Sequence, residues 1–172
     1  MSEFDTWVAA RSPQLARTAY LLTGDLQLAE DLLQDTLSRI AQRWEGLVRR
    51  GEPDAYARRV MYHLAVDWWR RRRTRPEIVT GVPLEPPIGA DDTDAWTRRI
   101  VLREALMRLT PRQRAVLVLR FFDDLSEQQT AQLLRCSVNT VKSQTRHALE
   151  RIRRLAPDLQ ELDQPTREVP TP

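Results

Sequence analysis

Apolar residues recur every three or four positions along much of the chain, which is the spacing of amphipathic helices. Ser12 followed by Pro13 predicts the N-terminus of a first helix, which ends at Gly24, and Asp25 predicts the N-cap of a second. The stripe expected to face inward in the second helix is Leu26, Ala29, Leu33, Leu37, Ile40 and Trp44. Pro53 predicts the start of a third helix, with one side formed by Tyr56, Val60, Leu64 and Asp67 or Trp68.

Three successive cap signals mark the second half of the chain. Thr110 with Gln113, and Ser126 with Gln129, match the capping box, and Ser137 is a further N-cap directly after the turn Arg135-Cys136. Two helices joined by so short a turn meet steeply. The residues expected at their contact are small or apolar: Ala131, Val138 and Val141. The pattern predicts a helix-turn-helix.

The helical period is lost in the middle of the chain, where residues 74–94 hold several prolines and glycines among acidic side chains. We therefore predict an all-α protein made of two small helical domains joined by a flexible acidic linker. The first unit covers residues 1–75, the linker 76–96, the second unit 97–156, and residues 157–172 form a disordered tail.

The composition of the chain excludes several classes of function. The 172 residues carry a net charge of only +3, but the basic residues cluster at 58–75 and 142–154, away from the acidic linker and tail. The single cysteine and two histidines supply neither a disulfide nor a metal cluster, so no cofactor or metal is expected. The acidic start lacks a signal-peptide pattern and no apolar run suits a membrane span, so we expect a cytoplasmic protein without membrane insertion.

The second helix of a helix-turn-helix enters the major groove by its amino-terminal end. Its outward side chains are Asn139, Thr140, Lys142, Ser143, Gln144 and Arg146. Amide side chains can bond adenine, and lysine and arginine can reach guanine or phosphate. The alternative is a helical interaction bundle with a polar face, but the successive caps and the basic exit favour duplex DNA.

Two further surfaces carry candidate chemistry. One joins aromatic and basic side chains at the end of the third helix: His63, Trp68, Trp69, Arg70, Arg71, Arg72 and Arg73. Such a surface can hold an unpaired strand, or it is a core anchor followed by a solvated helix end; the residues alone leave both open. The other is acidic, because Glu30, Asp31, Gln34 and Asp35 fall largely off the apolar stripe of the second helix.

The order of these motifs resembles the extracytoplasmic-function (ECF) sigma factors of bacterial RNA polymerase, close to the actinobacterial SigE-like group. Sigma region two is matched by RTAYLLTGDLQLAEDLLQDTL at 17–37 and DAYARRVMYHLAVDWWRRRR at 54–73. Region four is matched by residues 109–153, from LTPRQRAVLVLRFF to RHALERIR. The resemblance covers nearly the whole chain. Arg135 stands at a turn position that relatives often give to glycine.

The resemblance implies a dissociable, non-enzymatic subunit that directs core RNA polymerase to promoter DNA. Region two would dock on the β′ clamp helices through Asp31, Gln34 and Asp35, and melt the minus-10 element with the aromatic and basic set at 63–73. Region four would sit on the β flap and read the minus-35 element. The linker would thread toward the active-site cleft, or remain a solvated spacer, and an anti-sigma factor is a further partner that the resemblance admits.

Two alternatives remain at the level of sequence. A stand-alone helix-turn-helix regulator would bind its operator without polymerase. An interaction module would bind an anti-sigma partner without supporting transcription. An enzyme is less favoured than either, because no nucleophile and base pair, phosphate loop or metal cluster is visible.

Overall fold

The computed structural model describes residues 2–73 and 93–157, without the side chains of 72–73 and 93–99, and every element within them is helical. The first unit contains α1 (Glu3–Thr23), α2 (Leu26–Ala41), α3 (Trp44–Arg50) and α4 (Pro53–Arg73). The second contains α5 (Thr93–Met107), α6 (Pro111–Leu117), the π-helical turn η1 (Val118–Phe122), α7 (Glu127–Leu134) and α8 (Val138–Leu155). The all-α prediction is confirmed.

The predicted boundaries of the linker and the tail stay predictions. Residues 74–92 and 158–172 lie outside the described residues, and α5 begins at Thr93, within the range assigned to the linker. No helix of the described part is long and apolar enough to cross a membrane.

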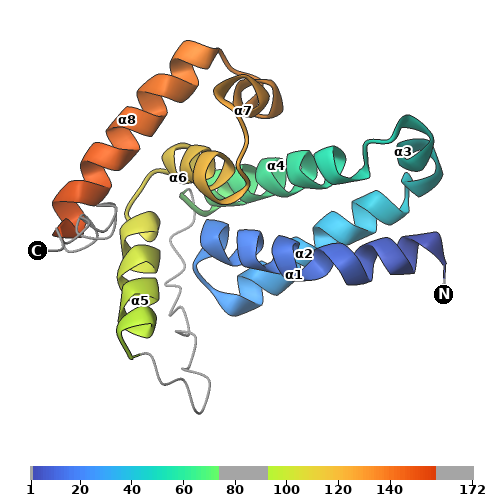
Figure 1. The fold of residues 1–172 in the computed structure, drawn as a ribbon, viewed down its shortest axis with the longest axis horizontal. Helices are drawn as coiled ribbons and strands as arrows, with labels where there is room; N and C mark the ends of the chain where they lie inside the picture. The colour runs from blue at the N-terminus through green and yellow to red at the C-terminus, as the bar shows by residue number, and fades with distance from the viewer. Residues whose placement is uncertain (1, 74–92, 158–172) are drawn as a thin grey trace, which may run out of the picture.

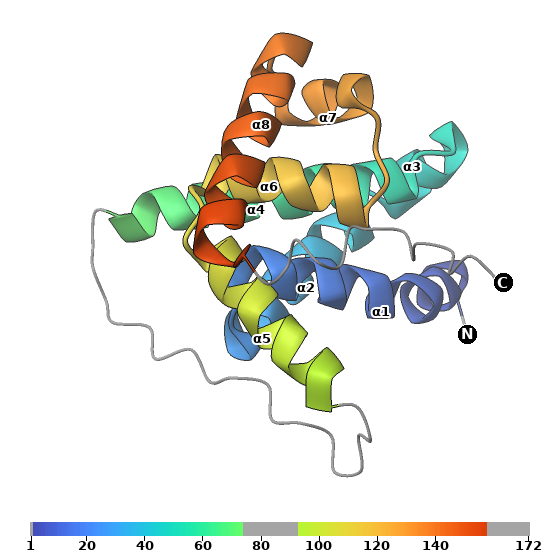
Figure 2. The ribbon, with the colours of Figure 1, turned by 60° about the vertical axis from the view of Figure 1, so that its left-hand side comes forward.

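The helices of the two units pack into one body (Figure 1). In the first unit α1 and α2 lie side by side and α4 packs against both, while in the second α6 and α7 pack against α8. The units also touch each other, because α4 contacts α6 and α7, and α1 contacts α5, α6 and η1 (Figure 2). The relative placement of the units is therefore set by packing.

The predicted caps are confirmed by their hydrogen bonds. The Leu28 amide donates to Asp25 at 3.0 Å, and the Thr140 amide donates to Ser137 at 3.0 Å. Both predicted capping boxes have their two reciprocal bonds. Arg135 ends α7 in the left-handed region, with φ of 52°, which explains why glycine suits this position.

The predicted start of the first helix was wrong. Helix α1 begins ten residues earlier, at a capping box formed by Ser2 and Asp5, and Pro13 lies inside it. An interior proline costs a helix about 3 kcal/mol. Tertiary contacts of the turns before Pro13 offset this cost, since Phe4 and Trp7 pack against Trp44, with ring centroids 5.1 and 5.5 Å apart.

The predicted stripe of α2 was partly wrong. Leu26 is 39% exposed, and the buried positions are Ala29, Leu32, Thr36 and Ile40. The helix ends at Ala41, and Trp44 belongs to α3. The buried face is rotated because α2 packs against both α1 and α4, and the Thr36 hydroxyl becomes tolerable in the core by donating to the Leu32 carbonyl at 2.7 Å.

Candidate nucleic-acid and polymerase interface

The helix-turn-helix presents the amino-terminal end of α8 at the surface. Asn139, Lys142 and Arg146 are exposed, and Thr140, Ser143 and Gln144 are half-buried. Val141 on the opposite side is fully buried against Val116 and Ala131. All six predicted contact residues thus lie within the first three turns of α8. The opposite, apolar side of this helix packs against the rest of the second unit.

The unpaired amides at the start of α8 add to its attraction for phosphate. Lys142 is not entirely unpartnered, since its ammonium lies 3.7 Å from Glu127 on α7, with both side chains partly exposed. An exposed pair of this kind contributes little stability, so Lys142 can exchange it for a phosphate at small cost.

The structure places the residues that were predicted to contact the minus-10 element in different environments. Arg70 and Arg71 are exposed at the end of α4, where Asp67 pairs with Arg70 at 3.2 Å. Trp68 and Trp69 are half-buried and meet edge to face, with ring centroids 4.8 Å apart. The side chains of Arg72 and Arg73 lie outside the described residues.

Trp69 is turned toward the second unit. Its indole Nε1 donates to the Leu22 carbonyl at 3.1 Å, and the guanidinium of Arg114 lies 4.6 Å from its ring centroid. The guanidinium occupies one face of the indole ring. The structure therefore brings Trp69 to the predicted end of α4 but covers one of its faces.

His63 lies on the side of α4 that faces α7. Burial lowers the pKa of His63, and the positive charge of Arg135 adds to that effect, while Asp67 opposes it. Its Nε2 atom is buried without a hydrogen-bond partner. His63 thus lies at the contact between the units, where its surroundings disfavour the charged form.

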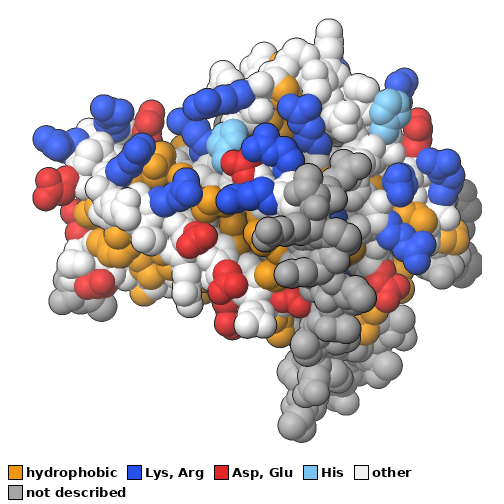
Figure 3. Space-filling model, turned by 180° about the vertical axis from the view of Figure 1, so that it is seen from behind, with side chains coloured by type: hydrophobic (Ala, Val, Ile, Leu, Met, Phe, Trp, Pro, Cys, Tyr) orange, Lys and Arg blue, Asp and Glu red, His pale blue; other side chains and the backbone are white. Residues whose placement is uncertain are grey.

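The predicted polymerase-docking residues form one exposed acidic surface. Asp31, Gln34 and Asp35 are all exposed on α2, and the spacing of three and four places them on one side of the helix. Figure 3 shows the face opposite to that of Figure 1, where Lys and Arg side chains form a band above most of the acidic ones. On this face most acidic side chains are thus set apart from the basic ones.

The structure contains a pocket that the sequence did not predict. An open pocket of about 1020 Å³ lies among α1, α2, α3 and the start of α4. Its lining includes four arginines and aromatic side chains, Arg43, Arg49, Arg50, Arg59, Trp44 and Tyr56, together with the carboxylates of Glu3, Glu45 and Glu52. Arg43 stacks on Tyr56, 5.7 Å from its ring centroid. Because these residues come from separate segments of the chain, no short spacing in the sequence predicts the pocket.

The residues between the two units were missed as well. Arg114 and Tyr62 are buried there, Asp123 is half-buried, and all three are hydrogen-bonded. The sequence gave no signal for them, because Arg114 adjoins an ordinary apolar run and Asp123 has the character of a turn residue. Within the described ranges no group of histidine, cysteine and carboxylate side chains could hold a metal ion.

Comparison with known proteins assigns the family. Residues 7–75 match the model of sigma-70 region 2, and residues 99–152 match that of sigma-70 region 4. The chain is 40% identical over 151 residues to the RNA polymerase sigma-E factor of Streptomyces coelicolor, covering 88% of this chain and 84% of the relative. It is 32% identical over 144 residues to the ECF sigma factor SigL of Mycobacterium tuberculosis, covering 81% and 80%.

Solved structures agree in fold. The sigma factor RpoE of Bartonella quintana, crystallised with the anti-sigma factor NepR, matches 95% of this chain and 100% of its own with a TM-score of 0.73 at 20% identity. CnrH, in complex with the cytosolic domain of CnrY, matches 94% and 89% with a TM-score of 0.61 at 21% identity.

These matches define a transcription initiation factor. The chain belongs to the sigma-70 family and, within it, to the ECF sigma factors of the actinobacterial sigma-E type, which confirms the resemblance of its motifs. It binds core RNA polymerase and directs promoter recognition.

Proposed function

We propose that the two units divide the promoter between them. The second unit reads the minus-35 element through Asn139, Thr140, Lys142, Ser143, Gln144 and Arg146, and the first melts the minus-10 element through His63, Trp68, Trp69 and Arg70 to Arg73. The observation that carries this proposal is the geometry of α8, whose capped and exposed end gathers amide and basic side chains as a major-groove helix requires.

The pocket beside α3 extends the strand-binding surface. Tyr56 at the pocket and Trp69 are thirteen positions apart on α4, or about 20 Å at 1.5 Å per residue. Arginines and aromatic rings at both ends of one helix suit an anionic strand with unpaired bases. The pocket would hold one base while Trp69 supports the opening of the duplex.

The acidic surface of α2 would attach the factor to polymerase. Asp31, Gln34 and Asp35 are exposed and suit a basic partner helix, which the β′ clamp helices would provide, and the second unit would sit on the β flap. Attachment at both places holds the two DNA surfaces at a fixed spacing and raises the local concentration of one once the other binds. The chain itself would bind rather than catalyse, and would work in the cytoplasm, with an anti-sigma factor as a further partner.

Promoter melting by a reconstituted polymerase tests the division of roles. With Trp69→Ala, we expect promoter opening, followed by a fluorescent base in the minus-10 element, to slow about tenfold or more, because base stacking is worth about 1–3 kcal/mol. Association with core polymerase should change little.

The control is Trp7→Ala, which removes an aromatic anchor of the first unit that packs on Phe4 and Trp44 but does not line the pocket. It should weaken association and opening together, because the first unit would fold less completely. If Trp69→Ala behaves in the same way, Trp69 has only a folding role, and if promoter binding by the chain needs no polymerase, the protein is a stand-alone regulator.

A further inference from the structure

An ion pair joins the two helices of the helix-turn-helix at the exposed end of α8. The ammonium of Lys142, on the second turn of α8, lies 3.7 Å from the carboxylate of Glu127, the first residue of α7. The side chain of Lys142 is 59% exposed and that of Glu127 36%. Both charged groups are therefore accessible to a duplex that α8 binds.

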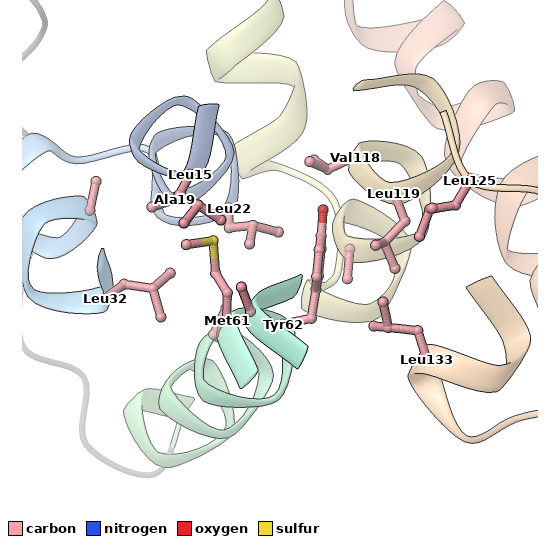
Figure 4. Packing of buried hydrophobic residues seen from close by; sticks show 14 of the residues in the cluster. Leu15, Ala19, Leu22, Leu32, Met61, Tyr62, Val118, Leu119, Leu125 and Leu133 are labelled. Atoms are coloured by element: carbon pink, nitrogen blue, oxygen red, sulfur yellow. The ribbon is translucent and has the colours of Figure 1, made fainter. Parts of the chain in front are cut away.

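Both partners stand on rigid supports. Leu125, two residues before Glu127, and Leu133 within α7 point into the core that the two units share (Figure 4). A capping box closes the start of α7. Lys142 follows Val141, which is fully buried. The backbone segments that carry the ammonium and the carboxylate are thus held in place relative to each other.

An acidic side chain is unfavourable at this place unless it contacts a hydrogen-bond donor of the DNA. In a helix-turn-helix the first helix crosses the DNA backbone, so the start of α7 comes near phosphates, which repel a carboxylate. The donors that the major groove offers are the amino groups of cytosine and adenine. A favourable role for Glu127 in the complex is therefore to accept a hydrogen bond from one of these amino groups.

The ion pair matches a G·C base pair in charge and in spacing. The O6 acceptor of guanine and the N4 amino donor of cytosine are hydrogen-bonded to each other, so they lie about 3 Å apart at the edge of the major groove. The ammonium and the carboxylate present a donor and an acceptor 3.7 Å apart. The ammonium of Lys142 would contact guanine O6 and the adjacent N7, while the carboxylate of Glu127 accepts from cytosine N4.

An A·T pair offers its groups in a different order. Its amino donor lies between two acceptors, adenine N7 and thymine O4, and the thymine methyl group stands beside O4. A carboxylate at the adenine amino group would be repelled by the neighbouring N7, and the ammonium would meet the methyl group. The ion pair therefore distinguishes G·C from A·T, whereas a lysine alone binds any acceptor within reach, phosphates included.

We propose that Glu127 and Lys142 together read one G·C pair of the minus-35 element, with Glu127 as a specificity-determining residue on the helix that precedes the recognition helix. The inference rests on the proposed reading of that element by α8. On other sequences the exposed ion pair opens at little cost, and Lys142 binds a phosphate instead. Glu127 thus makes the contribution of Lys142 depend on the sequence.

The ion pair can be observed in the free chain, because Lys142 is its only lysine. After labelling with ¹³C-lysine, the protein gives a single lysine Cε signal in the NMR spectrum. We expect this signal to shift with Glu127→Gln and to stay in place with Glu150→Gln, which removes the same charge from an exposed position about 12 Å farther along α8. An unchanged signal in Glu127→Gln would overturn the proposal.

The reading of the base pair is tested with polymerase carrying the factor and promoter fragments in which each minus-35 base pair is replaced in turn. With the wild-type chain, replacing one G·C pair by A·T should lower the affinity about tenfold, a usual effect of a mismatched base pair. Glu127→Gln should reduce this discrimination to about twofold, mainly because the unpaired Lys142 binds phosphates of the mismatched promoter more tightly. Glu150→Gln should leave the discrimination unchanged.

Lys142→Ala shows whether the two residues act on the same base pair. It should remove discrimination at the position that Glu127→Gln affects, and the double variant should lose no more than Lys142→Ala alone. The proposal is overturned if the two single variants relax different positions. It is also overturned if Glu127→Gln tightens binding to every promoter equally, because the carboxylate would then act only by repelling phosphates.

Failure of the proposed function gives a different pattern. If α8 does not read the minus-35 element, no variant of this helix, Asn139→Ala included, changes the base preference at any minus-35 position. If α8 reads the element without help from Glu127, Asn139→Ala changes the preference at its own position, and Glu127→Gln leaves every preference as it is in the wild-type chain.

Discussion

The two proposed DNA surfaces differ in their accessibility. The reading residues of α8 face away from the fold, held by apolar contacts on the opposite side of that helix, whereas Trp69 and His63 lie at the contact between the units. The difference teaches that a surface for duplex DNA can be displayed permanently. An aromatic surface for unpaired bases is apolar enough to be buried by the protein itself.

Substitution of Arg114 should weaken the contact between the two units more than any other change considered below. Replacing it with methionine removes its charged hydrogen bonds to the Leu22 and Leu106 carbonyls, and a hydrogen bond to a charged group contributes about 1.5–3 kcal/mol. We expect the free energy of unfolding, measured by urea denaturation, to fall by about 3 kcal/mol. Arg112→Met on the exposed side of the same helix should change it by no more than about 0.5 kcal/mol. Similar decreases in the free energy of unfolding for both variants would show that the hydrogen bonds of Arg114 do not stabilise the contact between the two units.

The exposed surface is tested by salt dependence. Lys142→Ala with Arg146→Ala should weaken binding of the polymerase complex to the minus-35 duplex about tenfold. The slope of log affinity against log salt should fall by about 0.9 for each phosphate that is no longer neutralised. Arg151→Ala, farther along α8, is the matched control and should have a smaller effect. An unchanged slope would show that Lys142 and Arg146 do not neutralise phosphates.

The capping boxes reveal whether the two units unfold together. Ser2→Ala in the first unit and Ser126→Ala in the second should each cost about 1 kcal/mol. Because the core crosses between the units, we expect both variants to shift one common calorimetric transition. Ser38→Ala on the exposed side of α2 is the control. Two separate transitions, each moved by one variant only, would show that the contact adds no cooperativity.

His63 gives the smallest expected effect, a dependence on pH. Its pKa is lowered in the folded state, so the folded protein binds fewer protons than the unfolded chain between that lowered pKa and the ordinary value near 6.5. Stability should therefore rise with pH through this window and decrease on acidification. His63→Gln should flatten the slope of melting temperature between about pH 5.5 and 7.5. His147→Gln, on the exposed surface of α8, should not.

Much of the local structure was predictable because its causes are local. Asp25, Thr110, Ser126 and Ser137 cap helices with bonds that span three residues, so their positions in the sequence suffice. The helix-turn-helix and its outward residues follow from these caps and from the helical period. The assignment to the sigma family rests on the same order of motifs.

Local rules failed where distant contacts outweighed them. Pro13 reads as a helix start, yet it lies inside α1 because Phe4 and Trp7 are anchored on Trp44, some forty residues away in sequence. The period of α2 indicated an apolar stripe, but two neighbouring helices selected a rotated face that includes Thr36.

By itself, the sequence determined the helices, their caps, the separation of basic and acidic segments, and the family. Only the tertiary structure decided which residues join the two units and that Trp69 is covered. Hydrogen bonds such as those of Arg114 to Leu22 and of Asp123 to Thr18 join residues about a hundred positions apart. No periodicity or short spacing records such a pairing, because it depends on how whole helices are placed against each other.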